Sequence, residues 1–185
     1  MSSISSPLTI AVMVGTARER RESVKVACYI AEFGRKQQSV EVILVDPREL
    51  DLPEDGDDIH DSRFTEITAR SDAFVIVTPE YNHSYPGSLK RALDSEFDNY
   101  WHKPVALVGV SSGDWGGVRA CEALLPVCHT LGMIIVKPEI YFPHVQDIFA
   151  EDGAIHQEYM ALYTKRTQRM YDELLWMARL FKGDS

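Results

Sequence analysis

Five short apolar runs alternate along the chain with segments that have helical periodicity. Runs of this length, bounded by glycine, proline and polar residues, are typical of strands buried on both faces of a sheet. Strands that alternate with helices predict a parallel sheet covered by helices on both faces. The sequence therefore predicts an α/β fold. The predicted strands are Leu8–Val14, Val40–Val45, Ala73–Val77, Val105–Val110 and Met133–Val136.

The segments between and after these strands carry helix signals. Ser23 is a good N-cap for the first helix, and Pro126 is expected to bend the fourth because it removes a backbone donor. Asp46–Asp61 is predicted as a loop and Lys137–Ile155 as a long connection, because both contain several prolines or glycines. The predicted helices are Ser23 to about Gln37, Ser62–Arg70, Pro86 to about Asn99, Gly117–Leu131, and about His156–Lys182.

The third predicted strand runs into a polar loop that feeds a helix. Pro79 cannot donate to a strand ladder and is expected to end the strand, whereas Pro86 suits the first turn of a helix. Open α/β sheets bind ligands at the carboxyl ends of their strands. The loop Glu80–Ser84 is therefore a candidate binding shelf, with Asn82 and backbone amides turned outward. The alternative is an ordinary connecting loop.

A second candidate loop, Gly15–Ser23, reads GTARERRES and lies between the first strand and its helix. Free amides and the positive end of the helix dipole attract a phosphate at such a position. Thr16 and Ser23 add hydroxyls, and three arginines within four positions suit a phosphate dianion. The alternative is a solvated loop whose arginines pair with neighbouring glutamates. Neither G-x-G-x-x-G nor G-K-[ST] is present, so a Rossmann dinucleotide site and a P-loop are unsupported.

A third candidate loop, Ser111–Ala120, reads SSGDWGGVRA and follows the fourth predicted strand. Its glycines would let a ligand approach the backbone closely, and Trp115 would line the pocket. The alternative is a glycine-rich helix entry in which Trp115 is a packing residue. The loop lies at the same predicted edge of the sheet as the other two, which favours a shared binding site.

Composition argues against several other classes. The formal charge of −9 argues against broad binding to nucleic acid or acidic membranes, and no apolar run is long enough to span a bilayer. The start of the chain lacks a signal-peptide pattern, so a cytoplasmic protein is expected. The histidines and the acid-rich Asp51–Asp61 stretch show no metal-ligand spacing, so no metal site is predicted. Cys28, Cys121 and Cys128 are expected to be small buried thiols in a reducing compartment.

The run TPEYNHSYPGSLKRALD, Thr78–Asp94, resembles the flavin-contacting loop of NADPH-dependent FMN reductases, a family that includes quinone, azo-dye and chromate reductases. That family also has a serine- and glycine-rich loop after its fourth strand. Arg20 departs from the glycine that is common in the family's phosphate loop. The residues that fit the phosphate-loop pattern are Gly15, Thr16, Arg18 and Arg21, with Ser23 at the helix start.

The resemblance, which covers most of the chain, implies a flavodoxin-like fold: a doubly wound, five-stranded parallel sheet of strand order 2-1-3-4-5, with helices on both faces. The switch point then lies between strands one and three, where two of the candidate loops meet. FMN is the implied cofactor and NADPH or NADH the hydride donor, with no catalytic side chain because the flavin carries the chemistry. The implied FMN-binding residues are Gly15, Thr16, Arg18, Arg21, Ser23, Pro79, Glu80, Tyr81, Asn82, Ser84, Ser111, Ser112, Gly113, Trp115 and Gly116.

The implied function is reduction of a small acceptor, with a quinone first and azo compounds, free flavin or metal oxyanions also considered. Two alternatives stay open: a flavodoxin-type electron carrier that serves a protein partner without oxidising NAD(P)H itself, and a flavin-free regulatory domain on the same fold. Residues 1–6 are expected to be a loose tail and residues 7–185 a single domain. Members of the family that the chain resembles are commonly dimers or tetramers. This resemblance and an aromatic cluster suggest a homodimer or homotetramer. The cluster comprises Tyr85, Phe97, Tyr100 and Trp101.

Overall fold

The computed structural model describes residues 6–52, 60–137 and 139–183. These residues contain a six-stranded parallel sheet of order β2-β1-β3-β4-β5, with β6 paired to β4. The order confirms the predicted flavodoxin-like topology, in which the sheet is wound from β1 in both directions. The strands are β1 (Leu8–Val14), β2 (Val40–Val45), β3 (Ala73–Pro79), β4 (Pro104–Val110), β5 (Ile134–Ile135) and β6 (Ile140–Phe142).

The sheet separates two hydrophobic layers. In β1, Ile10 and Val12 belong to one apolar cluster, whereas Ala11 and Met13 belong to the other. All four side chains are buried, because successive residues of a strand point to opposite faces and both faces are covered. This double burial explains why the run shows no alternation of polar and apolar residues.

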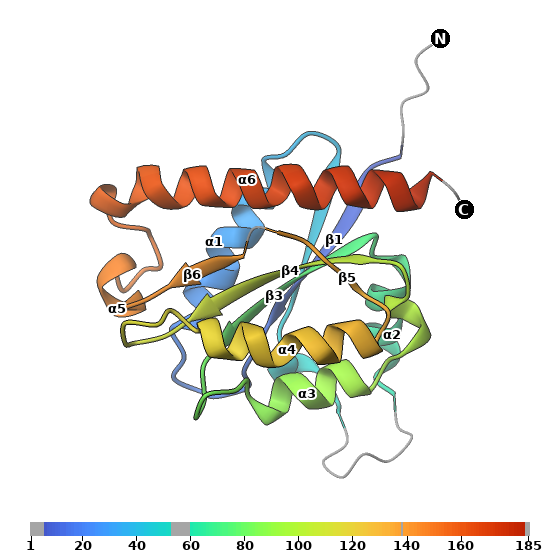
Figure 1. Ribbon diagram of the computed structural model, residues 1–185, viewed down its shortest axis with the longest axis horizontal. Coiled ribbons are helices and arrows are strands. Elements are labelled where there is room, and N and C mark those ends of the chain that lie inside the picture. The colour runs from blue at the N-terminus through green and yellow to red at the C-terminus, as the bar shows by residue number, and fades with distance from the viewer. Residues whose placement is uncertain (1–5, 53–59, 138, 184–185) are drawn as a thin grey trace.

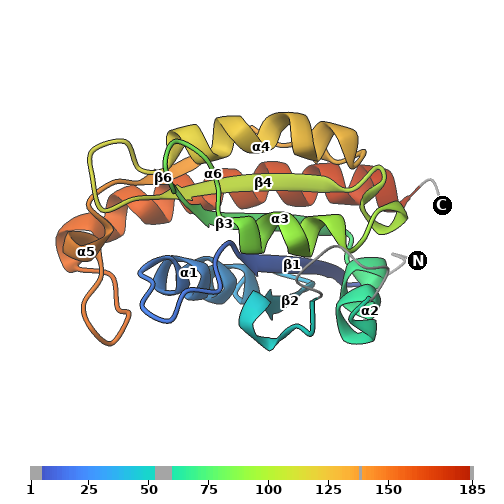
Figure 2. The same ribbon diagram turned by 90° about the horizontal axis from the view of Figure 1, so that it is seen from below.

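Helices cover both faces of the sheet (Figures 1 and 2). The helices α1 and α6 pack on one face, and α2, α3 and α4 pack on the other. Across the described ranges, no helix combines the length and apolar character that a membrane span requires. The helices are α1 (Ser23–Arg35), α2 (Ser62–Arg70), α3 (Gly87–Asp94), α4 (Val118–Thr130), α5 (Val145–Ile148) and α6 (Gln157–Lys182), with short 3₁₀ helices η1 (Pro47–Glu49) and η2 (Asp98–Tyr100).

The edge of the sheet beyond β4 is shared by two short strands, so the sheet has six strands rather than five. Ile134 of β5 lies opposite Pro104, and Phe142 of β6 lies opposite Val110 at the other end of β4. The predicted connection Lys137–Ile155 therefore contains a strand and a short helix. A three-residue strand leaves too short a pattern to recognise in sequence. It forms here because β4 offers an unpaired edge beyond the end of β5.

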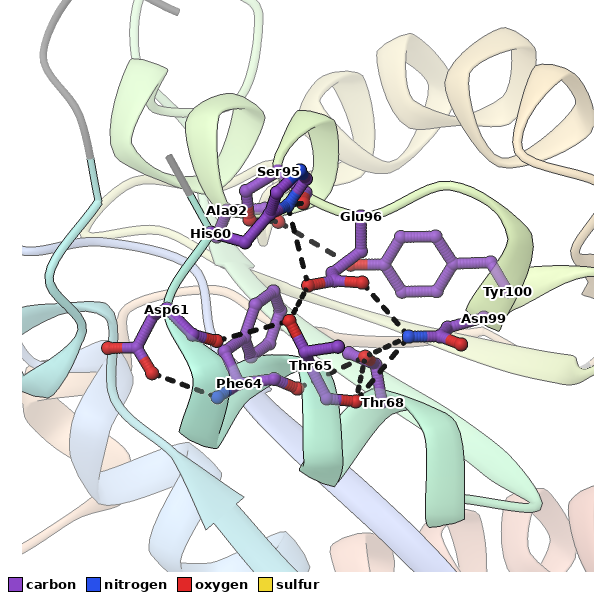
Figure 3. A network of polar contacts seen from close by, with 10 residues as sticks. All are labelled: His60, Asp61, Phe64, Thr65, Thr68, Ala92, Ser95, Glu96, Asn99 and Tyr100. Carbon is purple, nitrogen blue, oxygen red and sulfur yellow. Dashed lines mark hydrogen bonds and ion pairs between the residues drawn. The ribbon is translucent and has the colours of Figure 1, made fainter. Parts of the chain in front are cut away.

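The helix α3 ends earlier than the predicted Asn99, and a buried polar network follows it (Figure 3). The Glu96 side chain accepts hydrogen bonds from Thr65 Oγ1 and, at 2.9 Å, from Asn99 Nδ2. Tyr100 then packs edge-on against Phe74, with ring centroids 5.3 Å apart. Because a buried carboxylate needs its hydrogen-bond donors, these contacts draw the chain out of the helix and onto α2.

Two predicted boundaries at the site are wrong. Ser23 is the first residue of α1, and the capping position is held by Glu22. The strand β3 runs past the predicted Val77 but ends at Pro79, as expected of that proline, which lies opposite Val110 in the ladder. A proline is tolerated there because the next donor to the ladder is the Glu80 amide, 3.1 Å from the Val110 carbonyl oxygen.

The cysteine prediction holds for two of the three residues. Cys121 and Cys128 are buried, and burial raises the pKa of the Cys128 thiol to about 12. Cys28 is exposed instead. The helical register of α1 turns the neighbouring Ala27 and Ala31 toward the sheet and Cys28 away from it. Residues 53–59 of the acidic loop and residues 1–5 of the predicted tail lie outside the described residues.

Candidate functional site

The loops after β1, β3 and β4 meet at one edge of the sheet, on the side where α5 lies (Figure 1). They enclose a cavity of about 270 Å³. The residues that line this cavity are Thr16, Arg18, Arg20, Arg21, Glu22, Ser23, Pro79, Glu80, Tyr81, Val110, Ser111, Ser112 and Val145. The structure thus brings three loops that are far apart in sequence into one site. The predicted residues outside this lining are Gly15, Asn82, Ser84, Gly113, Trp115 and Gly116.

The loop after β1 is tied to the loop after β3. The Gly15 amide donates to the Val77 carbonyl oxygen at 2.7 Å, and a Cβ on Gly15 would lie 2.7 Å from that same oxygen. Only glycine therefore allows the two strand ends to approach this closely. Thr16 Oγ1 lies 3.0 Å from the Tyr81 hydroxyl, and the Arg18 guanidinium lies 4.7 Å from the centroid of the Tyr81 ring. The second contact has cation–π geometry.

Arg21 is held by groups of the chain itself. Its guanidinium donates to the Thr16 carbonyl oxygen at 2.6 Å and to both carboxylate oxygens of Asp46, at 2.8 Å for the Nη1–Oδ1 pair. Burial alone would raise the pKa of Asp46, but hydrogen bonds from Arg21 and the Arg48 amide outweigh it, so the pKa lies below its usual value. Arg21 thus anchors the loop to the end of β2.

Other polar side chains of the same loop remain available to a ligand. Ser23 Oγ is buried and makes no hydrogen bond to the described residues. Arg18 and Arg20 line the cavity and are exposed. A phosphate supplies the acceptor oxygens that a hydroxyl and guanidinium groups need. The donor set therefore fits the phosphate end of FMN at the start of α1, where the helix dipole also favours an anion.

The loop after β3 uses most of its backbone amides internally. The Tyr81 amide donates to the Ser84 carbonyl oxygen at 2.8 Å, and the Ser84 amide donates back to the Tyr81 carbonyl oxygen at 3.0 Å. Asn82 and His83 occupy the tip of this turn in the left-handed region, with φ of 49° and 66°. Asn82 is exposed at the tip, as predicted. The amides of Glu80, Tyr81 and Ser84 are committed to the fold, so the expected outward-facing shelf is reduced to the tip.

The glycines of the loop after β4 have structural reasons to be glycine. A Cβ on Gly117 would lie 2.4 Å from the Val110 amide nitrogen, and one on Gly116 would lie 2.8 Å from Tyr141 Cβ. Both residues have positive φ. The loop therefore folds back onto β4 and β6 so tightly that side chains cannot fit. Gly113 differs, because nothing lies within 4 Å of the position of its Cβ.

The segment between β6 and α5 braces that loop. The Ser111 amide donates to the Phe142 carbonyl oxygen at 3.0 Å, and the Val145 amide donates to the Ser111 carbonyl oxygen at 3.1 Å. His144 Nε2 lies 2.6 Å from Asp114 Oδ1. The unexpected strand β6 thus fixes the position of Ser111 at the cavity, because it carries the brace to the edge of the site.

Four lining residues, Arg20, Glu22, Val110 and Val145, are absent from the predicted binding set, and three supporting residues outside the lining were not predicted either. Asp46 binds Arg21, Ser88 Oγ accepts a hydrogen bond from the Ala17 amide at 3.2 Å, and Arg119 contacts Glu80. Asp46 directly follows a strand that neighbours β1, so its place at the carboxyl edge was a usable signal. The partners of Ser88 and Arg119 depend on how loops approach one another in space, for which the sequence contains no local pattern.

Comparison with known proteins places this site in context. The family profile described as NADPH-dependent FMN reductase matches residues 8–147 of the chain. A quinone reductase of Pseudomonas putida KT2440 is 32% identical over 168 residues, which cover 84% of this chain and 88% of the relative. A 2-hydroxy-1,4-benzoquinone reductase of Burkholderia sp. is 33% identical over 164 residues, covering 82% of this chain and 87% of the relative.

A solved structure shows the same architecture. FerB, a flavoenzyme NAD(P)H:(acceptor) oxidoreductase from Paracoccus denitrificans, superposes with a TM-score of 0.76 at 26% sequence identity. The superposition covers 92% of this chain and 98% of FerB. The family profile, which matches residues 8–147, spans the strands of the described sheet and the three loops around the cavity.

Proposed function

The chain belongs to the NADPH-dependent FMN reductase family, and from that premise we propose that the cavity between the three loops is its FMN site. The protein is an NAD(P)H-dependent FMN oxidoreductase that acts on small acceptors. Bound FMN would supply the redox chemistry by taking a hydride from NAD(P)H and passing electrons to the acceptor. The tasks of the chain are to bind the flavin, orient it and keep one side open.

The phosphate end of FMN is assigned to the loop after β1. Arg18 and Arg20 supply charge-assisted donors, and Ser23 Oγ supplies a hydroxyl that is otherwise unsatisfied. Thr16 and Arg21 serve the site differently, because their polar groups already bind Tyr81 and Asp46. They hold the loop in shape before the ligand arrives, which lowers the entropy cost of binding. Gly15 permits the close approach of the strands behind it.

The ring end of FMN is assigned to the loops after β3 and β4. One wall comprises Pro79, Glu80 and Tyr81, with Asn82 and Ser84 at the turn. The other comprises Ser111, Ser112 and Gly113, with Trp115 and Gly116 behind. The amides of Glu80, Tyr81, Ser84 and Ser111 are committed to the fold, so backbone stabilisation of negative charge on the ring would have to come from the turn tip at Asn82 and from Ser112 and Gly113. We name no catalytic side chain, since the flavin itself reacts with both substrates.

The observation that carries this assignment is the buried, unpartnered hydroxyl of Ser23 at the cavity wall. A buried donor without an acceptor is costly, and a bound phosphate removes that cost. The test is titration of apoprotein with FMN and with riboflavin, which lacks the phosphate. We expect the wild type to bind FMN far more tightly than riboflavin. Ser23→Ala should reduce this difference in affinity between the two ligands. Equal binding of both ligands would contradict a phosphate site.

A quinone is the acceptor we propose, because two relatives of about one-third identity are described as quinone reductases. NADPH oxidation by the holoprotein should be stimulated by 1,4-benzoquinone. A flavodoxin-type carrier would bind FMN but would not turn over NADPH, and a flavin-free regulatory domain would purify without colour. Steady-state NADPH oxidation and the absorbance spectrum of the purified protein separate these three cases.

We also propose a cytoplasmic homo-oligomer built from one domain that spans residues 7–185. All three cysteines are free thiols, which suits a reducing compartment. Phe97 and Trp101 are 51% and 53% exposed, whereas Tyr100 is buried in the core. Of the predicted aromatic cluster, Phe97 and Trp101 are therefore the side chains most available for self-association.

A further inference from the structure

Arg119 contacts both loops that flank the proposed ring site. It is the second residue of α4, directly after the loop that follows β4. Its Nε lies 2.7 Å from Glu80 Oε1, and its Nη1 lies 2.9 Å from His83 Nε2, so it contacts the loop after β3 twice. Its guanidinium also lies 5.3 Å from the centroid of the Trp115 ring in its own loop. One side chain thus spans the two loops.

The contact with Glu80 is an unusual ion pair. The Glu80 side chain is only 10% exposed, against 36% for Arg119. Glu80 Oε2 is buried and has no hydrogen-bond partner in the described residues, and the Arg119 Nε–H is not aligned for a hydrogen bond to Oε1. The Arg119 guanidinium is therefore the positive charge that faces this buried carboxylate. Removal of that charge would leave a carboxylate buried and uncompensated, which is more costly than loss of the pair itself.

The contact with His83 defines the tautomer of the imidazole. A guanidinium has donors but no acceptor. The Nη1–Nε2 contact therefore requires Nε2 of His83 to accept, with the proton on Nδ1. His83 lies in the left-handed region at the tip of its turn, and Arg119 contacts it there. The same arginine thus supports both the base and the tip of the loop.

We propose that Arg119 is a positioning residue that locks the loops after β3 and β4 into one unit at the ring side of the cavity. The inference rests on the proposed function, because it takes this cavity as the flavin site. Arg119 acts through Glu80, which lines the cavity, while the phosphate donors lie on the separate loop after β1. Its loss should disturb the ring environment and the substrates that meet the ring more than it disturbs phosphate binding.

The test is a double-mutant cycle with Arg119→Ala, Glu80→Gln and the double variant, and with Arg91→Ala as a surface control from α3. In the holoprotein, Arg119→Ala should lower kcat/KM for NADPH and for 1,4-benzoquinone by about tenfold or more, because small misplacements at a reacting centre are costly. It should also change the visible circular dichroism of the bound flavin. Arg91→Ala should match wild type in both measurements.

The same double-mutant cycle also measures the cost of leaving the Glu80 carboxylate unpaired. Arg119→Ala should lower the Tm of the apoprotein by several degrees, and the same change in the Glu80→Gln background should lower it much less, since no carboxylate is left unpaired. Arg119→Lys should recover Tm, because it restores the charge. It should recover kcat/KM only in part, because an ammonium lacks the planar fork that contacts two partners.

Three results would overturn the proposal or its premise. Unchanged kcat/KM and dichroism in Arg119→Ala would show that the loops do not need the arginine. Equal Tm losses from Arg119→Ala with and without the Glu80→Gln substitution would show that Arg119 does not act through Glu80. A wild-type holoprotein that fails to oxidise NADPH would refute the proposed function instead. The Tm values of the apoprotein variants would still show whether Arg119 holds the two loops together through Glu80.

Discussion

Arg21 donates through two nitrogens to the two carboxylate oxygens of Asp46, which joins the loop after β1 to the end of β2. The Arg21 side chain is only 7% exposed and that of Asp46 is 17% exposed. Arg21 also donates to the Thr16 carbonyl oxygen within its own loop. A bidentate pair of this kind fixes the relative orientation of the two side chains as well as stabilising their contact. The proposed phosphate loop is therefore shaped by the fold before any ligand binds.

The first prediction follows from this pair. Asp46→Asn removes the charge that Arg21 binds, so the loop should lose its preorganised shape and the affinity for FMN should fall by about tenfold. Titration of apoprotein with FMN measures the effect. The matched control is Glu41→Gln, which breaks the Arg70–Glu41 ion pair, whose side chains are both more than half exposed. An equal loss of affinity in the control would contradict the role of Asp46.

The pH dependence of stability tests the same pair. The pKa of Asp46 is lowered in the folded state, so its contribution to stability is fully present above the ordinary carboxyl value of about 3.9 and is lost as the pH falls through the folded pKa. Wild type should be more stable than Asp46→Asn at pH 7. The difference should shrink below about pH 4. Urea unfolding at a series of pH values gives the free energies of unfolding of both proteins. A difference between them that grows as the pH falls would contradict the prediction.

Two glycines give a matched pair of substitutions. Gly15→Ala would place a Cβ 2.7 Å from the Val77 carbonyl oxygen, whereas a Cβ at Gly87 would meet nothing within 4 Å. Gly15→Ala should therefore lower stability and FMN affinity together, because β1 and β3 must move apart. Gly87→Ala, in the first turn of α3, should be neutral or stabilising by up to about 1 kcal/mol. Thermal unfolding of both variants checks the contrast, and a Gly15→Ala protein as stable as wild type would count against it.

The Arg18 side chain is exposed at the cavity and lies over the Tyr81 ring. Arg18→Ala removes a charge-assisted contact worth about 1.5–3 kcal/mol, so FMN should bind roughly tenfold to a hundredfold more weakly. Riboflavin binding should change much less, since it has no phosphate. Arg48→Ala, exposed beside Asp46, controls for the loss of a surface charge. Equal weakening of FMN and riboflavin would show that Arg18 does not act on the phosphate.

Self-association is tested by light scattering at micromolar concentration. The exposed Phe97 lies beside Pro126, Val127 and Leu131 along a cavity of about 520 Å³ between α3 and α4. Phe97→Asp places a charge on this apolar surface and should shift a dimer or tetramer toward the monomer. Trp176→Asp changes an equally exposed aromatic residue on α6 and serves as the control. A wild-type protein that scatters as a monomer would contradict the proposed oligomer.

Local pattern alone predicted the alternation of strands and helices that makes this an α/β fold. The runs Leu8–Val14 and Val40–Val45 became strands at their predicted bounds, and Ser62–Arg70 became a helix at its predicted bounds. These elements can be predicted because burial on one face imposes a hydrophobic period of 2 or 3.6 residues, and burial on both faces gives a continuous apolar run. The strand order needed the family resemblance as well, since right-handed crossovers still permit more than one winding.

Partners across the fold were decided only by the tertiary structure. The sequence contains the arginines of the loop after β1, but only the sheet brings Asp46 to Arg21 and leaves Arg18 exposed at the cavity. In the same way, Gly116 and Gly117 are glycines because β4 and β6 leave no room for a Cβ, although their sequence pattern equally suits contact with a ligand. Sequence periodicity records which faces of an element are buried. Which side chains then meet depends on the order in which the sheet places its strand ends, and that order joins residues far apart in the chain.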